Sequence, residues 1–220
     1  MLKERTIIVT GANGALGSQV CEIAESLGAR TIRLDLVFAE AGVDRHEIDL
    51  TDLGATTALV DSLGEFDGVF NIAGGFAMGT DAWAAQDSEW DRMVALNVTT
   101  MRNMIKATVP HLVKRGGGSI VNVGAYGARE GQGEMSAYCA SKSVVMRLTE
   151  SLANELRGQG VNVNAVLPTV IDTQVNRDAM PDADPTQWVA PGDLANVVCF
   201  LGSSAARAVH GALVPVRGLS

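Results

Sequence analysis

Residues 6–17 read Thr6-Ile7-Ile8-Val9-Thr10-Gly11-Ala12-Asn13-Gly14-Ala15-Leu16-Gly17, and they set the architecture expected for the whole chain. A short β-branched apolar run leads into a glycine-rich turn, and the apolar residues that follow recur at helical spacing. A strand, a tight glycine turn and a helix amino terminus can bind a pyrophosphate, because backbone N–H groups and the helix dipole face the anion. Such turns also occur where a strand only packs against a helix.

The next predicted strand supports the nucleotide-binding interpretation. Residues 31–35 read Thr-Ile-Arg-Leu-Asp, and the carboxylate of Asp35 follows the glycines by about twenty residues, where a ribose 2′-hydroxyl is bound. A carboxylate there repels a 2′-phosphate, so we expect NAD(H) to be favoured over NADP(H). The alternative is that Asp35 is a solvated turn residue.

A second motif lies in the stretch Ser136-Ala137-Tyr138-Cys139-Ala140-Ser141-Lys142. At a spacing of four, the phenol of Tyr138 and the ammonium of Lys142 share one face of a predicted helix. A free tyrosine has a pKa near 10, and a nearby positive charge favours the phenolate and lowers that pKa. The pair therefore indicates proton transfer, although helical spacing alone would not exclude coincidence.

Composition favours one α/β domain over residues 1–220. Apolar residues make up 47% of the chain and there are 24 glycines, as a parallel sheet with tight turns requires. The net charge is −8 without a basic cluster, and the apolar runs are short, so neither nucleic acid nor a membrane is an expected partner. No signal peptide is apparent. The three cysteines lack metal-ligand spacing, so we expect no metal site and a reducing, cytoplasmic location.

Strand and helix patterns alternate along the chain, which predicts a single-domain Rossmann-type doubly wound parallel sheet of about seven strands with helices on both faces. Ser88 and Asp91 form a capping-box-like start of the longest helix, and Pro110 is a candidate kink. The predicted strands are 6–10, 31–35, 44–48, 68–73, 119–123, 161–167 and 212–216, and the predicted helices are 15–28, 51–63, 88–114, 138–157 and 192–202.

In this order and spacing, the motifs resemble those of the short-chain dehydrogenase/reductase family over the whole chain. The resemblance is specific because many motifs occur together. They are Thr10-Gly11-x-x-x-x-x-Gly17, Asp35, Asp49-Leu50, Asn71-Ile72-Ala73-Gly74, Asn97, Tyr138-x-x-x-Lys142, Pro168 with Thr173, and the closing segment 211–218.

The resemblance implies a catalytic role for three residues. Tyr138 would be the general acid or base, Lys142 would bind the nicotinamide ribose and lower the tyrosine pKa, and Asn97 would hold a water that links Lys142 to solvent. Asp49 would touch the adenine, and Thr173 would contact the nicotinamide amide. The full set expected to bind the cofactor is Gly11, Asn13, Ala15, Leu16, Gly17, Asp35, Asp49, Leu50, Asn71, Ala73, Gly74, Tyr138, Lys142, Pro168, Ile171 and Thr173.

The chain departs from the family pattern at the catalytic serine, because the corresponding residue is Ala125. Alanine cannot hydrogen-bond a reacting oxygen, and loss of one such donor costs on the order of 100-fold or more in rate. Tyr126 and Ser136 are candidate replacements. The glycine turn has Ala15 at its sixth position, and Thr169 follows Pro168 where the family has glycine.

One branch of the family, dihydropteridine reductase, resembles the chain in these departures. It too is serine-less, and it is similar in the Gly-Ala-Leu-Gly turn, in Ala73-Gly74-Gly75-Phe76 and over residues 165–184. That branch reduces a quinonoid ring with NADH, and the delocalised charge there lessens the need for a point donor. There are two alternatives. The chain could be an ordinary alcohol or ketone dehydrogenase, or a dinucleotide-binding sensor without catalysis.

The substrate side is expected around Phe76, Ala125, Tyr126 and Trp188. Trp188 would stack on a flat ring or anchor the lid over residues 180–188. Phe76 and Trp83 would line the cleft or pack, and Trp90 would be core. The acid-rich lid disfavours a strongly anionic substrate, although Arg129 and Arg177 could offset it.

A homodimer or homotetramer is expected through helices 88–114 and 138–157, as in the family. These helices carry apolar residues beyond a single stripe. The residues are Met93, Leu96, Met101, Met104, Val109 and Leu112 on the first helix, and Val144, Val145, Leu148 and Leu152 on the second.

Overall fold

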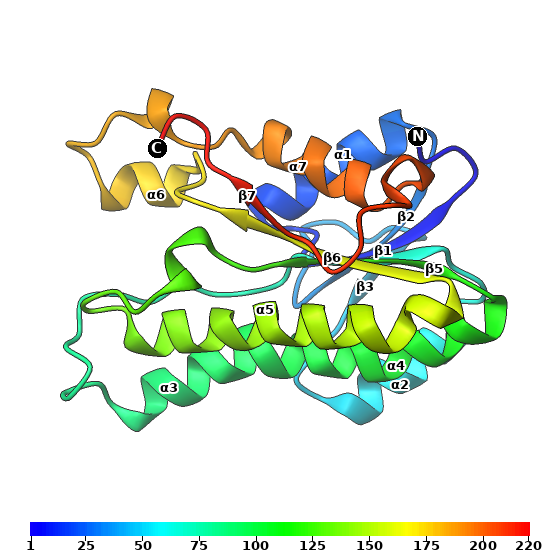
Figure 1. Cartoon of the computed structure of the whole chain (residues 1–220), viewed down its shortest axis with the longest axis horizontal. Helices are drawn as coiled ribbons and strands as arrows, with labels where there is room; N and C mark the ends of the chain where they lie inside the picture. The colour runs from blue at the N-terminus through cyan, green and yellow to red at the C-terminus, as the bar shows by residue number, and fades with distance from the viewer.

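All seven strands join one parallel sheet in the order β3-β2-β1-β4-β5-β6-β7 in the computed structural model, which describes residues 1–220 (Figure 1). This confirms the predicted single-domain doubly wound α/β fold. The β-branched and apolar runs are buried on both faces, as expected for strands in such a sheet. The strands are β1 (Thr6–Thr10), β2 (Arg30–Asp35), β3 (Arg45–Glu47), β4 (Gly68–Asn71), β5 (Gly118–Val123), β6 (Val161–Pro168) and β7 (Leu213–Val216).

Helices cover both faces of the sheet (Figure 1). Helices α1 and α7 lie on one face, and α2, α4 and α5 lie on the other, where α3 continues into α4. No helix is long and apolar enough to cross a bilayer. The helices are α1 (Ala15–Ser26), α2 (Leu53–Ser62), α3 (Asp87–Val94), α4 (Thr100–Arg115), α5 (Ser136–Leu156), α6 (Gln174–Ala179) and α7 (Pro191–Leu201).

Two apolar clusters hold the helices on the sheet. One joins α1 and α7 to it through Val9, Val20 and Val198, and the other joins α4 and α5 to it through Ile8 and Ile120. Each fully buried side chain of this size stabilises the fold by about 1.5–3 kcal/mol relative to an exposed one. The sheet is thereby a rigid platform for the loops at its edges.

The strand order places one crevice at the carboxyl edge of the sheet. From β1 the chain builds outward to β2 and β3, and it then returns to place β4 on the other side of β1. Loops that leave β1 and β4 therefore diverge to opposite faces, which leaves room for a ligand at this switch point.

The sequence-based boundaries agree with the structure to within two residues, but details within and between the predicted elements differ. The long helix is not continuous, because a π-helical turn over Ala95–Thr99 separates α3 from α4. The capping-box prediction is wrong: α3 begins at Asp87, after Gln86, without a side-chain cap. Pro110 lies inside α4 and does not end it. The short helix α6 was not predicted.

Candidate active site

A cleft of about 450 Å³ lies at the switch point between β1 and β4. It brings together most of the predicted nucleotide-binding residues from the ends of β1, β2 and β4 and from the loop after β3. Its walls are Gly11, Asn13, Gly14, Leu16, Gly17, Asp35, Leu36, Ile48, Asp49, Leu50, Thr51, Ile72, Ala73, Gly74, Leu96 and Thr100.

The turn between β1 and α1 is too tight for a side chain at its last glycine. A Cβ at Gly17 would lie 1.9 Å from the carbonyl oxygen of Gly11, so the turn requires glycine there. Helix α1 follows Gly14 with no side-chain cap and no acidic residue in its first turn. Its first N–H groups have no intrahelical acceptors and can bind an anion.

Asp35 holds the two sides of the cleft rim together. Its carboxylate accepts hydrogen bonds from the backbone N–H of Asn13 at 2.8 Å and of Leu36 at 2.7 Å. The side chain of Asn13 donates in turn to the carbonyl oxygen of Val37 at 3.1 Å. The carboxylate is half-buried beside the cleft, so it retains lone pairs for a hydroxyl group but adds negative charge against a phosphate.

The loop after β3 forms the far wall of the cleft. Asp49 accepts hydrogen bonds from the hydroxyl of Thr51 at 2.7 Å and from its backbone N–H at 2.9 Å, and these bonds lower the pKa of Asp49. The side chain of Asn103 on α4 donates to the carbonyl oxygen of Leu50 at 2.9 Å. The loop is thus fixed before any ligand binds.

Tyr138 lies in the first turns of α5, half-buried against an aromatic neighbour. Its ring meets that of Phe76 edge-on, with centroids 4.8 Å apart, and Phe76 is itself 50% exposed. Burial raises the pKa of Tyr138 to about 12. The expected lowering by Lys142 is not seen in this structure, because burial is the dominant influence on the phenol and the ammonium makes no counterbalancing contribution.

Lys142 is buried one helical turn further along α5. Its Nζ donates to the carbonyl oxygen of Val123, at the end of β5, at 2.8 Å. Burial lowers the pKa of Lys142 to about 8. A Cβ at Gly74 would lie 3.1 Å from this Nζ and 2.7 Å from Oδ1 of Asn97, so the two side chains converge on the cleft wall.

Asn97 sits in the π-helical turn, and π-turns are frequent at functional sites. Its Oδ1 accepts from the N–H of Gly75 at 2.9 Å. Its Nδ2 donates to the carbonyl oxygen of Gly75 at 3.0 Å and to Oγ of Ser141 at 3.1 Å. Asn97 therefore ties the loop after β4 to α5 beside Lys142, while its water-holding role stays a prediction.

The position of the missing serine is apolar. Ala125 is buried in a small cluster with Ala128 and Cys139, and Tyr126 and Tyr138 pack against that cluster. The hydroxyl of Tyr126 accepts from Arg217, and the buried Oγ of Ser136 has no hydrogen-bond partner. Neither candidate hydroxyl is seen bonded to the other groups of the site.

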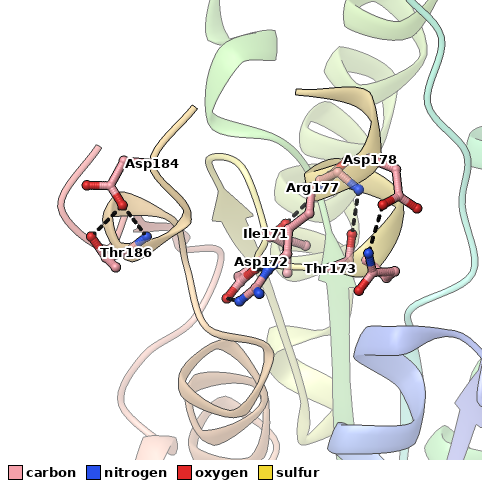
Figure 2. A network of polar contacts seen from close by, with 9 residues as sticks. Ile171, Asp172, Thr173, Arg177, Asp178, Asp184 and Thr186 are labelled. Atoms are coloured by element: carbon pink, nitrogen blue, oxygen red, sulfur yellow. Dashed lines mark hydrogen bonds and ion pairs between the residues drawn. The ribbon is translucent and has the colours of Figure 1, made fainter. Parts of the chain in front are cut away.

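A hydrogen-bonded segment follows β6 and leads into the predicted lid over residues 180–188 (Figure 2). Thr173 caps α6 by accepting from the N–H of Asn176, and Arg177 pairs with Asp172 at 2.6 Å. Ile171 bridges to Val189, next to the half-buried Trp188. The closing segment covers this region, since the N–H of Leu219 donates to the carbonyl oxygen of Gln187 at 3.1 Å.

Several predicted residues lie elsewhere than expected. Asn71 is buried and donates to Asn122 at 2.8 Å, so it is not part of the cleft wall. Trp83 is 87% exposed and packs on nothing substantial, and Trp90, expected in the core, is 37% exposed. The other predicted cofactor residues that do not line the cleft are Ala15, Tyr138, Lys142, Pro168, Ile171 and Thr173.

Sequence reasoning missed some walls of the cleft. Leu36 and Thr51 adjoin the predicted Asp35 and Leu50, so proximity in the chain could have indicated them. Leu96 and Thr100 come from the π-helical turn and the start of α4. They face the cleft only because α4 packs across the sheet, and no local pattern marks them.

Comparisons with known proteins agree with this geometry. The family model described as short chain dehydrogenase matches residues 5–184. The 2-(S)-hydroxypropyl-CoM dehydrogenase 3 of Xanthobacter autotrophicus is 33% identical over 249 residues, which cover 99% of this chain and 96% of that protein.

Solved structures with bound cofactors share the fold. Carveol dehydrogenase from Mycobacterium avium in complex with NAD has a TM-score of 0.86 at 27% identity, covering 97% of this chain and 96% of that chain. A protein from Beutenbergia cavernae, described as an NAD(P)-dependent gluconate 5-dehydrogenase with bound NADP, has a TM-score of 0.90 at 26% identity, with coverages of 99% and 96%.

Proposed function

This chain belongs to the short-chain dehydrogenase/reductase family and is an NAD(P)-dependent oxidoreductase, and we propose that it uses NADH to reduce a small conjugated or cyclic substrate without a catalytic serine. The observation that carries the proposal is the contrast between two neighbouring positions. The proton-transfer residue Tyr138 has an aromatic neighbour in Phe76, whereas Ala125 offers only a methyl group in an apolar cluster.

The residues present fit a nicotinamide dinucleotide. The cleft has a glycine turn, an uncapped helix amino terminus for the pyrophosphate and a carboxylate, Asp35, for the ribose. When bound, the cofactor supplies the hydride. We infer that NADH is favoured over NADPH, because Asp35 would repel a 2′-phosphate.

Tyr138 would deliver the proton that accompanies hydride transfer. Its phenol is neutral at pH 7, as a proton donor to substrate must be, since burial raises its pKa to about 12. Lys142, close to the cleft wall, would orient the nicotinamide ribose and favour the phenolate once Tyr138 has given up its proton. Asn97 fixes the loop after β4 against α5 and so helps to hold Tyr138 and Lys142 in position beside that loop.

Delocalised charge explains why Ala125 would be tolerated. Reduction of a simple ketone concentrates negative charge on one oxygen, which a serine hydroxyl normally stabilises. In a quinonoid or imine-like ring the charge spreads over several atoms, so a single donor matters less. Phe76, edge-on to Tyr138 and half exposed, offers a surface on which such a ring can pack.

A second candidate is a dehydrogenase of simple alcohols and ketones. The named relatives favour it, because they are described as dehydrogenases of hydroxypropyl-CoM, carveol and gluconate. In that case a local group would replace the serine, and Ala125→Ser should raise activity toward ketones.

The deciding experiment is NADH oxidation by the purified protein with quinonoid dihydropterin, compared with cyclohexanone and with NADPH in place of NADH. Fast turnover of the pterin by wild type, unimproved by Ala125→Ser, would support the serine-less reductase. Turnover of cyclohexanone that rises in Ala125→Ser, with no turnover of the pterin, would support the second candidate instead. Tight NADH binding without any turnover would favour a sensor.

We also infer that the chain forms a homo-oligomer through α3, α4 and α5. Most residues expected at that interface are buried within the chain itself, including Met93, Met104 and Val145. The large apolar side chains that are exposed on these helices are Trp90, 37% exposed, with Val94 and Val144, each 41% exposed. Sedimentation velocity of wild type and Val144→Glu would test this assignment.

A further inference from the structure

We propose that Arg129 and Arg217 form a binding site for an anionic group on the substrate, at the mouth of the active site beside Tyr126. The inference rests on the proposed function and narrows its substrate to molecules that carry a carboxylate or a comparable anion. It runs against the expectation from sequence that the acid-rich lid disfavours such a substrate.

Two guanidinium groups gather on one tyrosine ring. The guanidinium carbon of Arg217 lies 4.7 Å from the ring centroid of Tyr126, and that of Arg129 lies 5.1 Å from it. Nη1 of Arg217 also donates to the tyrosine hydroxyl at 3.4 Å. The ring of Tyr126 thus contacts both guanidinium groups through cation–π interactions.

Neither cation has a carboxylate side chain as a partner. Six side-chain ion pairs occur in the molecule, and none includes Arg129 or Arg217, although Glu130 adjoins Arg129 in the chain. Arg177, the other arginine expected near the substrate, is already paired with Asp172 through two hydrogen bonds. Of these three arginines, Arg129 and Arg217 at Tyr126 are the two without a carboxylate side chain as a partner.

Three carboxylates in the lid and in the segment before it accept hydrogen bonds from neighbouring groups (Figure 2). Asp172 accepts from Arg177, Asp178 accepts from Gln174 at 2.7 Å, and Asp184 accepts from the N–H and hydroxyl of Thr186 at 3.0 and 2.7 Å. These bonds lower the pKa of Asp172 and Asp184 and direct their oxygens to internal donors. Of these carboxylates, Asp172 has its charge offset by a cation, because Arg177 pairs with it.

The arginine pair lies on the substrate side of the site. Tyr126 and Arg129 follow β5, and Arg217 follows β7, so all three stand at the carboxyl edge of the sheet. Tyr126 and Tyr138 pack against the same buried cluster around Ala125. The reacting part of a substrate would lie at Tyr138, and its anionic group would lie at the arginines, away from Tyr138.

Arg217 is held in place from several directions. Its Nε donates to the carbonyl oxygen of Ser220 at 2.8 Å, and its own carbonyl oxygen accepts from the hydroxyl of Thr169 at 2.9 Å. A preoriented guanidinium loses less conformational entropy on binding. Arginine suits this role because its planar fork matches a carboxylate.

The test compares matched probes that differ only in charge: 3-oxocyclohexane-1-carboxylate and its methyl ester. Their affinities for the NADH-loaded protein are measured by calorimetry, and their KM and kcat by NADH oxidation. We expect wild type to bind the carboxylate about 10- to 100-fold more tightly than the ester. That preference should vanish in the double variant Arg129→Met with Arg217→Met. Arg30→Met, which removes an exposed arginine paired with Asp44, should retain it.

The two readouts separate the two proposals. A preference for the carboxylate that is lost in the double variant supports the anion site, even if neither probe is turned over and the proposed reduction fails. Equal affinities for the two probes in wild type, or a preference that survives in the double variant, overturn the anion site. Unchanged NADH affinity of the double variant shows that it remains folded.

Discussion

The two halves of the carboxyl edge, which we propose for the nucleotide and for the substrate, present different chemical groups. In the nucleotide half, at the ends of β1 to β4, the walls are mainly backbone, small side chains and two carboxylates, Asp35 and Asp49. In the proposed substrate half, at the ends of β5 to β7, the ring of Tyr126 contacts the guanidinium groups of Arg129 and Arg217. Tyr138 and Lys142 stand between the halves on α5.

The two halves also differ in how their groups are held in place. The nucleotide half is held by short-range hydrogen bonds, such as those of Asp35 to the N–H groups of Asn13 and Leu36. The substrate half depends on loops that meet from distant parts of the chain, as when Arg217 reaches Tyr126. Changes in one half should therefore leave the other intact.

The largest effect is expected from Tyr138→Phe, at the junction of the halves. The variant keeps the ring that packs against Phe76 but removes the hydroxyl that we propose as the proton donor. Turnover should fall by about 10²- to 10⁴-fold, which is the usual contribution of general acid–base catalysis. Steady-state kinetics with the best substrate measures this loss, and fluorescence titration should give an NADH affinity within about twofold of wild type. Persisting turnover would show that another group moves the proton.

A smaller effect is expected from Asp35→Asn, which acts on the nucleotide half alone. The variant removes the charge but keeps an oxygen that can accept the N–H of Asn13 or Leu36. Without repulsion of the 2′-phosphate, the ratio of kcat/KM with NADH to that with NADPH should fall about tenfold, equivalent to about 1.4 kcal/mol. Substrate KM should not change.

Asp61→Asn is the matched control, because this exposed carboxylate lies on α2 and pairs with His111 outside the cleft. Its cofactor ratio should equal that of wild type. An unchanged ratio in Asp35→Asn as well would mean that the carboxylate does not select the cofactor.

The sequence predicted the nucleotide half far better than the substrate half. The strand–turn–helix unit and Asp35 could be found because their geometry depends on neighbours in the chain and on glycines where no side chain fits, as at Gly17. The burial of Tyr138 and of Lys142, which raises the pKa of the first and lowers the pKa of the second, could not be predicted, since it arises from tertiary packing of α5. The π-helical turn at Asn97 could not be predicted either. Nor could the contacts of Arg129 and Arg217 with Tyr126, which bring residues 126–129 and residue 217 together.

The smallest expected effect is on the pH dependence of the free energy of unfolding, and it depends on Lys142 at the junction of the halves. Burial lowers the pKa of Lys142 to about 8 from its ordinary 10.5, so the unfolded chain binds this proton more tightly than the folded one. Between pH 8 and 10.5 the unfolded state holds more protons, and the free energy of unfolding rises with pH. Below pH 8 the lysine is protonated in both states and its full burial cost is present. Wild type should therefore gain about 1–2 kcal/mol between pH 7.5 and 9.5 relative to Lys142→Met.

Urea unfolding of both proteins at pH 7.5, 8.5 and 9.5 measures this gain. The range stops below pH 10 because the raised pKa of Tyr138 has the opposite sign: above pH 10 the folded state holds the phenolic proton more tightly, and stability falls. Lys106→Met, which removes an exposed lysine on α4, should follow the wild-type profile. Parallel profiles for wild type and Lys142→Met would show that the ammonium is well solvated in the folded protein. The junction between the two halves would then be open to water, and Lys142 would be protonated throughout the working range of the enzyme.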